Sequence, residues 1–319
     1  LGARRKDVLL QGHIGAVLQK GQYLRSRDVK LCDEYIRDFL TRFHTDYIDL
    51  GMMHFIDTQE DYDLAFGSEY IDYCQELKRR GVVRFLGASS HNAVTARKMV
   101  ETGLVDVLLF SINPAFDLLP GETEIDDLLK EELYEGRFAI DPDRAALYRL
   151  CEEKGVGITV MKTLAAGRLL DEASSPFGVA LTPVQCIEYA LTRPAVAAVM
   201  VGCKSRAEIE AALAWCGAPA AERDYTAVMT GLERFSWRGH CMYCGHCAPC
   251  PKGIDVASVT KFLNLARAQG MVPETVREHY AALAHKAGEC IACGACSKRC
   301  PFGVDAVENM RRTEETFGA

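Results

Sequence analysis

Two runs of cysteine near the end of the chain constrain its fold more than any other feature. Eight of the fourteen cysteines lie there, and each run ends in a Cys-Pro pair. The first run is Cys241, Cys244, Cys247, Cys250 and Pro251, and the second is Cys290, Cys293, Cys296, Cys300 and Pro301. Thiolates at every third residue, closed by Cys-Pro, match the ligand spacing of proteins that hold two 4Fe-4S clusters. We therefore predict a two-cluster domain over residues 236–319.

Zinc is the main alternative for these cysteines, because C-x2-C pairs also form zinc ribbons and fingers. A ribbon takes its four ligands from two such pairs. Here each run supplies three cysteines at two-residue spacing and a fourth beside proline, for which a zinc ribbon has no use. The spacing therefore favours iron–sulfur clusters over zinc.

Disulfides are a second alternative. Disulfide-rich secreted domains are usually short, whereas residues 1–218 read as a large ordinary core with scattered cysteines. The cysteines outside the two runs are expected to be small hydrophobic core residues. They are Cys32, Cys74, Cys151, Cys186, Cys203 and Cys216. This pattern indicates a protein of the reducing cytoplasm.

The composition is that of a globular protein. The chain has 319 residues, of which 49% are hydrophobic and 25% are charged, enough for a full-sized core and one small additional domain. Its formal charge of -7 gives no general attraction to nucleic acid or anionic lipid. No apolar run is long enough to span a bilayer. We expect neither nucleic acid nor a membrane as a partner.

Six apolar runs rich in Val, Ile, Leu and Met alternate with stretches of helical periodicity from residue 8 onward. Their apolar character is continuous rather than alternating, which indicates strands that are covered on both faces, as in a parallel sheet. The predicted strands are Val8–His13, Tyr47–His54, Val83–Ser89, Val105–Asn113, Val156–Lys162 and Val196–Gly202.

Helix-start signals fall between these runs. They combine a capping residue with a first-turn proline or with a capping box. The signals are Thr182-Pro183 with Gln185, Ser205 with Glu208, and Asp141-Pro142. One helical stripe, interpreted as plain core packing, consists of Leu31, Ile36, Phe39, Leu40 and Phe43.

Repeated strand–helix units permit either a doubly wound open sheet or an eight-stranded barrel. The first strand leads into Gly12-His13-Ile14-Gly15, which lacks the G-x-G-x-x-G turn of a dinucleotide-binding open sheet. We therefore predict an α/β fold with a TIM-type (β/α)8 barrel over residues 1–218 and a linker over 219–235. A barrel needs eight strands and six are visible, so about two units are expected to be missing before Leu1.

Two connections interrupt the regular alternation. Between Asn113 and Asp141 the chain contains an acidic segment, 122–127, and a stretch, 128–138, that is compatible with a short helix. A lid or binding loop and a solvated surface insertion are both open interpretations of this connection. After Trp215 the alternation stops, and Tyr225–Phe235 reads as a helix that links the barrel to the cysteine runs.

Barrel enzymes collect their chemistry at the C-terminal ends of the strands. Each polar residue at such a position has an ordinary explanation as a strand end or a helix cap, but six strands that end in this way favour an active site. The residues concerned are His13, His54, Ser89-Ser90-His91-Asn92, Asn113, Lys162 and Gly202-Cys203-Lys204-Ser205.

Three motifs stand in order along the chain. They are Asp46-Tyr47-Ile48-Asp49-Leu50 running to His54, the segment 81–91 with the sequence GVVRFLGASSH, and Val160-Met161-Lys162 with Gly167-Arg168-Leu169. These motifs resemble the aldo-keto reductase superfamily, and the cysteine-rich tail resembles the branch with a C-terminal ferredoxin-like domain. The resemblance covers nearly the whole chain from Arg4 onward, and it implies an oxidoreductase built on a barrel.

The resemblance implies carbonyl reduction by hydride from a nicotinamide cofactor, with an Asp, a Tyr, a Lys and a His at the site. His54 matches the histidine, which orients the substrate. At the lysine position this sequence has His13, and the Asp and Tyr positions would lie before Leu1. A lysine ammonium lowers the pKa of the tyrosine, whereas a histidine does so only when protonated, with an unperturbed pKa of about 6.5. We therefore expect His13 and His54 to form a different acid–base pair.

The resemblance also implies a set of residues that bind NADP(H) or NAD(H). They are Ser89 and Ser90 for the nicotinamide amide, Asn113 where a glutamine often stands, Lys162, and Lys204, Ser205 and Arg206 for a phosphate. The last three residues lie at a helix start, where free N–H groups and cationic side chains favour an anion. A capped surface helix is the alternative interpretation of the same three residues.

The two cysteine runs are separated by a segment with a helical stripe, which is too long for a compact bacterial ferredoxin and resembles the helical ferredoxin type. The stripe is Val259, Phe262, Leu263 and Ala266. By that pattern the fourth cysteine of each run crosses to the other cluster. One cluster would take Cys241, Cys244, Cys247 and Cys300, and the other Cys290, Cys293, Cys296 and Cys250.

The leading hypothesis is a cytoplasmic oxidoreductase in which the barrel acts on a small organic substrate and the clusters pass electrons to or from it. Hydride transfer moves two electrons and a cluster moves one, so a flavin, a radical step or a redox partner protein is needed to bridge them. Two alternatives stay open. One is an electron carrier or complex subunit with a non-catalytic barrel, and the other is NADPH-dependent carbonyl reduction with structural clusters.

Overall fold

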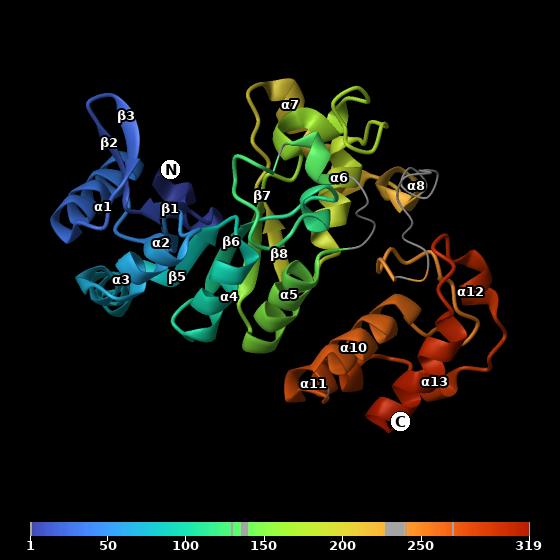
Figure 1. The fold of residues 1–319 in the computed structure, drawn as a ribbon. Coiled ribbons are helices and arrows are strands. Elements are labelled where there is room, and N and C mark those ends of the chain that lie inside the picture. Colours follow the sequence, from blue (N-terminus) through green and yellow to red (C-terminus); the bar gives the residue numbers. More distant parts are fainter. Residues whose placement is uncertain are drawn as a thin grey trace.

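The computed structural model describes residues 2–128, 130–134, 140–226, 239, 241–269 and 271–318. Figure 1 shows a parallel sheet flanked by helices and, at the C-terminal end of the chain, a smaller group of helices beside it. The predicted fold class is confirmed: six strand–helix units of a barrel-like α/β fold precede a small helical domain.

All six predicted strands form one parallel sheet in the order β1-β4-β5-β6-β7-β8. They are β1 (Gln11–Ile14), β4 (Ile48–Met53), β5 (Val83–Ser90), β6 (Val107–Ser111), β7 (Gly157–Met161) and β8 (Val196–Val199). The first strand begins later than predicted, because side chains form hydrogen bonds with the backbone of Val8 and Leu10. Asp49 accepts from the Leu10 N–H at 2.9 Å, and Arg5 donates to the Val8 carbonyl at 2.8 Å.

A β-hairpin that the sequence analysis did not predict follows β1. Strands β2 (Ala16–Gln19) and β3 (Gln22–Arg25) pair antiparallel across a two-residue turn. Both turn residues, Lys20 and Gly21, have positive φ angles of 50° and 75°, as a type I′ turn requires. The Lys-Gly pair is a weaker turn signal than Asn-Gly, and most of the hairpin is exposed. The sequence therefore contains neither a strong turn signal nor an apolar run that would have predicted the hairpin.

Helices pack along the sheet, as the alternating pattern predicts. They are α1 (Val29–Phe43), α2 (Gln59–Phe66), α3 (Glu69–Arg79), α4 (Ala93–Glu101), α5 (Pro142–Lys154), α6 (Pro183–Leu191), α7 (Arg206–Leu213) and α8 (Ala220–Arg223). Short 3-10 helices are η1 (Gly2–Asp7), η2 (Phe116–Leu118), η3 (Glu131–Tyr134), η4 (Ala165–Leu170), η5 (Ala214–Gly217) and η6 (Ala287–Glu289).

The predicted caps form, with one exception. Thr182 and Gln185 make the full capping box of α6, and Asp141 caps α5. Ser205 accepts from the Glu208 N–H at the start of α7, but the Glu208 carboxylate accepts from the Lys204 N–H instead of completing the box. Only half of the predicted box is therefore present at α7.

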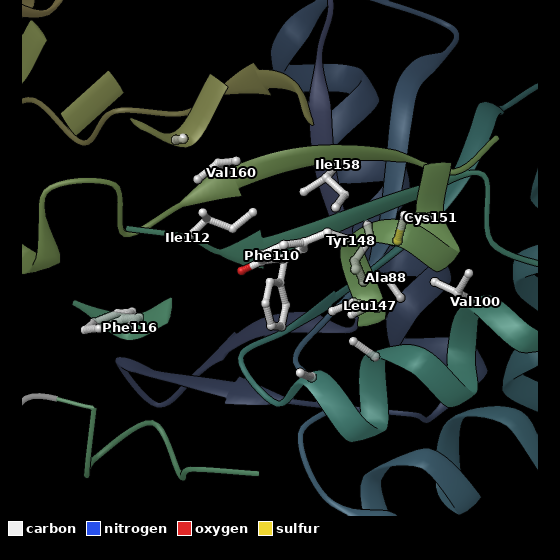
Figure 2. Packing of buried hydrophobic residues seen from close by; sticks show 14 of the residues in the cluster. Ala88, Val100, Phe110, Ile112, Phe116, Leu147, Tyr148, Cys151, Ile158 and Val160 are labelled. Carbon is white, nitrogen blue, oxygen red and sulfur yellow. The ribbon is translucent and has the colours of Figure 1, made fainter. Parts of the chain in front are cut away.

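The core lies between the sheet and its helices. Figure 2 shows Phe110 of β6 and Ile158 of β7 beside Leu147, Tyr148 and Cys151 of α5, all of them buried. Four of the six scattered cysteines are buried as predicted, namely Cys32, Cys74, Cys151 and Cys186. The prediction was wrong for Cys203, which is half-buried, and for Cys216, which is exposed, because both lie in the outermost part of the last unit.

The long connection after β6 begins inside the core. Asp117 is fully buried and accepts hydrogen bonds from the hydroxyls of Tyr148 at 2.5 Å and Tyr189 at 2.8 Å. Its carbonyl accepts from the Asp141 N–H at 2.7 Å, which ties the two ends of the connection together. Of the stretch 128–138, the described part contains only the short η3, and residues 135–139 lie outside the description.

The C-terminal domain consists of four α-helices in its described part. They are α10 (Val256–Gln269), α11 (Glu274–Ala282), α12 (Ala295–Arg299) and α13 (Ala306–Phe317). The predicted stripe of α10 is buried, and Val259 and Phe262 belong to a core that also contains Met310 and Phe317 of α13. The predicted linking helix Tyr225–Phe235 lies almost entirely outside the described residues.

Replacing Gly87 of β5 by Ala is expected to destabilise the barrel by about 1–3 kcal/mol, because a Cβ there meets the Val107 carbonyl at 2.6 Å and the Met52 sulfur. The matched control is Gly157→Ala in β7, where the nearest atom, the Ala197 Cβ, lies 3.8 Å away. Urea unfolding of both variants tests this. Equal midpoints for the two variants would contradict the packing at Gly87.

Candidate functional site

The histidines that end β1 and β4 face each other. Parallel pairing places His13 beside Met52, and His54 follows two residues later, directly after the end of β4. The His54 N–H donates to the Ile14 carbonyl at 3.0 Å. The two Nδ1 atoms lie 3.2 Å apart, and the rings are nearly perpendicular at 78°. The structure therefore brings the predicted pair within hydrogen-bond distance.

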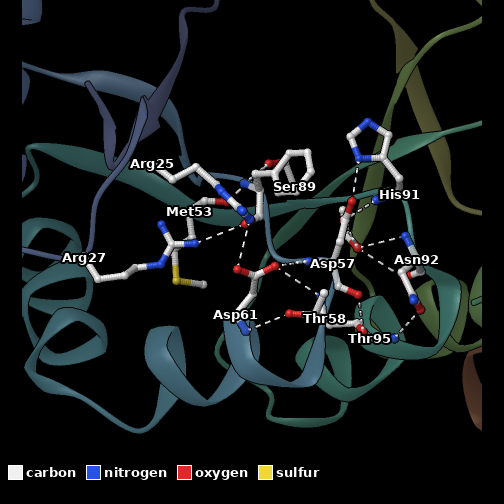
Figure 3. Close-up of polar contacts among 12 residues, drawn as sticks. Arg25, Arg27, Met53, Asp57, Thr58, Asp61, Ser89, His91, Asn92 and Thr95 are labelled. Atoms are coloured by element: carbon white, nitrogen blue, oxygen red, sulfur yellow. Dashed lines mark hydrogen bonds and ion pairs between the residues drawn. The ribbon is translucent and has the colours of Figure 1, made fainter. Parts of the chain in front are cut away.

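The hairpin supplies further side chains around this pair. The Tyr23 ring lies 5.6 Å from the His54 ring, and Arg25 lies over the Phe55 ring at 4.4 Å. Arg27 donates to the carbonyls of His54 at 2.7 Å and Phe55 at 3.2 Å. Figure 3 shows both arginines beside the loop that follows β4. Sequence reasoning missed Tyr23 and Arg25 because it missed the hairpin that carries them, and it missed Arg27, which follows the hairpin by two residues.

Burial and neighbouring charge keep the histidine pair neutral. Burial, followed by the proximity of His13, Arg27, Arg25 and His91, lowers the pKa of His54 to about 4. Burial also lowers the pKa of His13. Near neutral pH neither ring is a cation, so His13 does not reproduce the positive charge of the lysine that the resemblance leads one to expect. The two neutral rings can instead share a hydrogen bond between their Nδ1 atoms.

The free energy of unfolding is expected to depend on the protonation of His54. Its folded pKa of about 4 lies below the ordinary value of 6.5, so the unfolded chain binds more protons between these values. The contribution of His54 is therefore complete above pH 6.5 and is lost as pH falls towards 4. Urea midpoints at pH 5.5, 6.5 and 7.5 should fall less with acid in His54→Gln than in the unmodified chain or in the control His279→Gln. Equal slopes in all three proteins would contradict the lowered pKa.

The predicted nicotinamide-binding serines have partners inside the protein. The Ser89 hydroxyl accepts from the Phe55 N–H at 2.7 Å, and the Ser90 hydroxyl donates to Asp57 at 2.9 Å. His91 also contacts Asp57 at 3.0 Å. Although burial by itself raises the pKa of Asp57, the hydrogen bonds and charge of His91 lower it below its ordinary value. Figure 3 shows these groups holding the loop after β4 against the end of β5.

Asn113 is fully buried at the end of β6. Its side-chain oxygen accepts from the N–H groups of Ala115 at 3.0 Å and Phe116 at 2.8 Å. Its amide nitrogen donates to the Lys162 carbonyl at 2.9 Å. These bonds join the ends of β6 and β7, and contact between Asn113 and a cofactor stays a prediction.

Lys162 and Lys204 line one cavity of about 590 Å³ beyond the ends of β7 and β8. Lys162 has a positive φ of 60°, a conformation that a residue with a side chain rarely adopts. Glu208 lines the same cavity, and its carboxylate accepts from the Lys204 N–H at 2.6 Å. Ser205 caps α7, whereas Arg206 is exposed and pairs with Glu210 at 2.7 Å. Two of the predicted cofactor residues thus share a cavity, and Arg206 is not among its lining residues.

The eight clustered cysteines divide between two small cavities. One is lined by Cys241, Cys244, Cys247 and Cys300, and the other by Cys250, Cys290, Cys293 and Cys296. These are the two sets that the crossed arrangement predicts. Each cavity offers four thiol groups around an otherwise mostly apolar space, so the residues present fit a four-cysteine cluster in each.

The loops around these cavities repeat one backbone conformation. In the first, Tyr243 and Gly245 have positive φ; in the second, Ala292 and Gly294 occupy the equivalent positions and do the same. N–H groups point at sulfur, as in the 3.4 Å contact from Ala292 to Cys290. Such loops favour anionic groups. A sequence signal for the repeat exists in the matching segments CMYCGHC, 241–247, and CIACGAC, 290–296.

The cluster domain packs against α5 and α6 of the barrel. Met242, Phe302 and Val304 belong to the same hydrophobic cluster as the barrel core. Lys261 of α10 pairs with Glu152 of α5 at 3.0 Å, and Arg193, after α6, donates to the Met242 carbonyl at 3.2 Å. The sheet order places His13 and His54 on the two strands farthest from β8, so the histidine pair and the cysteines lie towards opposite edges of the sheet. In Figure 1, β1 lies on the left and the helices α10 to α13 of the C-terminal domain lie at the lower right.

Comparison with known families decides the class of the protein. Residues 20–179, half of the chain, match the aldo/keto reductase family. The chain belongs to this family. Residues 240–305 match the 4Fe-4S dicluster domain, which agrees with the cysteine cavities. Among the described residues, no helix is both long and apolar enough to cross a membrane.

Individual relatives are distant from this aldo/keto reductase. The uncharacterized oxidoreductase YqkF of Bacillus subtilis is 26% identical over 210 residues, which cover 62% of this chain and 65% of the relative. The chain thus spans slightly less than two thirds of that protein. The holo form of an aldo-keto reductase from Bacillus halodurans is similar in structure, with a TM-score of 0.51, 21% identity and coverage of 73% of this chain and 75% of the other. This likeness shows the fold.

Proposed function

We propose that this protein is an iron–sulfur oxidoreductase that converts a small organic substrate, a carbonyl compound or a related one, at His13 and His54. Electrons come from NAD(P)H, from the clusters, or from both. The observation that carries the proposal is the division of eight cysteines between two cavities of a domain that packs against a reductase-family barrel. The reducing environment that such clusters need favours a cytoplasmic location.

The histidine pair can supply both a proton donor and a base. In an Nδ1–Nδ1 hydrogen bond between neutral rings, one ring donates, and the other carries its hydrogen on Nε2. The Nε2–H of the accepting ring can donate to a substrate oxygen, while the Nε2 of the donating ring is free to accept a proton. When the accepting ring loses its Nε2 proton, the hydrogen between the rings can move to the Nδ1 of that ring. A solvent proton then binds the Nε2 of the other ring.

We assign Lys162 and Lys204 to the cofactor, because both line the cavity beyond β7 and β8 and can place positive charge beside a phosphate. Ser89, Ser90 and Asn113 would then position the cofactor indirectly through the loops that they hold. The proposed cluster ligands are the two cysteine sets named above, which supply one-electron transfer when a cluster is bound. The proposed domain limits are 1–218, 219–235 and 236–319.

Glu208→Gln is expected to tighten NADPH binding more than NADH binding, because Glu208 places a carboxylate in the cavity where an additional phosphate would bind. Lys204→Gln should weaken both, and NADPH more. Fluorescence titration with each nucleotide measures the change, with Glu210→Gln as the control on the same helix. Identical ratios of NADPH to NADH affinity in all variants would contradict a phosphate site at this cavity.

The overall proposal is tested on anaerobically purified protein. It should show broad visible absorption that bleaches with dithionite, and it should use reducing equivalents with small aldehydes or ketones. Colourless protein with stoichiometric zinc would overturn the iron–sulfur part. Intact clusters that transfer electrons to a partner protein, with no dependence on the histidine pair, would favour the electron-carrier alternative.

A further inference from the structure

A cavity of about 750 Å³ lies between the barrel and the cluster domain. The barrel side is formed by α5 and by Arg193-Pro194, and the opposite side by α10, α13 and the loop that begins at Cys241. Cys241, Met242 and Val304 also line the first cluster cavity, so the two spaces share a wall. The volume lies within the range that accommodates a small organic molecule.

Arginine dominates the charge of this cavity. Among the described residues, the arginines that line it are Arg149, Arg193, Arg267 and Arg312. The acidic residues of the same described lining have partners: Glu308 pairs with Arg312 at 2.6 Å, and Asp305 caps α13 by accepting from the Glu308 N–H at 3.0 Å. Within the described part of the chain, no carboxylate lies within 4.0 Å of the other three arginines. The cavity therefore holds an excess of positive charge.

Arg193 is the strongest indication that an anion belongs there. The residue is only 3% exposed, and its Nη2 donates to three neutral oxygens, those of the Thr192 hydroxyl, the Tyr225 hydroxyl and the Met242 carbonyl. Its Nε is buried and has no acceptor. The buried carboxylate of Asp117 attracts this guanidinium at longer range but forms no ion pair with it within 4.0 Å. The cost of its desolvation is therefore only partly repaid.

A cluster bound beside Cys241 is negatively charged and compensates part of this excess. However, none of the arginines lines the cluster cavity itself. Arg149 and Arg267 belong to opposite sides of the larger cavity, one on α5 and one on α10. Burial lowers the pKa of the Arg149 guanidinium, although the proximity of Tyr243 and of the Glu153 carboxylate opposes that shift. The three arginines without a close ion-pair partner therefore all line the larger space.

We propose that this cavity binds a small organic anion, with a phosphate or carboxylate group held among Arg149, Arg193 and Arg267, against the wall shared with the Cys241 cavity. The site is distinct from the proposed active site, since neither His13, His54 nor Lys204 lines it. A bound anion lies close to one cluster and far from the histidine pair, so its arrival should perturb that cluster directly.

The test uses anaerobic protein with both clusters present and two probes, inorganic pyrophosphate and citrate. Calorimetry should detect saturable binding of at least one probe, and the paramagnetic resonance spectrum of the reduced clusters should change on binding. The double variant Arg149→Gln/Arg267→Gln should weaken binding at least about tenfold, because two charge-assisted contacts are lost. Arg277→Gln, an exposed change on α11 outside the cavity, should leave it unchanged.

Visible absorption and circular dichroism must show that the double variant keeps its clusters and fold. If it loses them, the single changes Arg149→Gln and Arg267→Gln replace it, and each should weaken binding; unchanged affinity in both would overturn the proposal. Absence of binding for both probes would overturn the proposal. The proposal would also be overturned if the double variant kept its affinity and Lys204→Gln abolished binding. That result would place the anion in the cavity beyond β7 and β8 that Lys162 and Lys204 line.

Discussion

Removing Cys241 together with Cys300 is expected to abolish one cluster, whereas removing Cys290 together with Cys300 is expected to abolish both. The first two thiols line the same cavity, and the second two line different cavities. The double variant Cys241→Ala/Cys300→Ala should thus keep about four of about eight iron atoms per chain, and Cys290→Ala/Cys300→Ala should keep almost none.

Iron and sulfide analysis of anaerobically purified variants measures this difference directly. The control is Cys216→Ala, an exposed cysteine outside both cavities, which should keep all the iron. If each run held its own cluster, the two double variants would exchange their results, because Cys290 and Cys300 would then be ligands of one cluster. That exchange would refute the crossed assignment.

His54→Gln is expected to lower turnover at the barrel by about 10²–10⁴-fold, the usual contribution of a group that donates or accepts the transferred proton. Glutamine keeps a polar side chain of similar size but cannot exchange a proton with His13 across the 3.2 Å contact. Cluster content and reduction by dithionite should stay unchanged, since the histidine pair and the cysteines lie on different elements far apart in the fold.

The readouts are reduction of small aldehydes and ketones, visible absorption and iron content, with His279→Gln as a control for a histidine on the cluster domain. A variant that retains full turnover would remove His54 from the chemistry and favour a barrel that serves as a docking scaffold. A variant that loses iron would show that the change acts through folding.

The sheet could be predicted from the sequence because strands covered on both faces leave long apolar runs, as in Tyr47–His54 and Val83–Ser89. The hairpin could not, because its strands are short and largely exposed and its Lys-Gly turn is not a strong signal. The start of β1 also differs from the prediction. The side chains of Arg5 and Asp49, which lie outside the strand, form hydrogen bonds with the backbone of Val8 and Leu10.

The candidate sites divide in the same way. The two cysteine runs follow from spacing, a local property, whereas their crossed division into two sets came from the resemblance to the helical ferredoxin type. His13 and His54 follow from parallel pairing of strand ends. The arginine-lined cavity between the domains depends on contacts that are distant in sequence, such as Arg193 with Met242, and no local sequence pattern predicts it. Likewise, the positions of Ser89, Ser90 and Asn113 are visible in the sequence, but their internal hydrogen bonds are not.

Whether the barrel and the clusters take part in one redox reaction is tested most directly by anaerobic titration of the oxidised protein with NADPH and with NADH while the visible absorption of the clusters is recorded. We predict bleaching by at least one nucleotide, at concentrations that rise in Lys204→Gln. Full bleaching by dithionite with no response to either nucleotide would contradict this link and would assign the clusters to a separate electron donor.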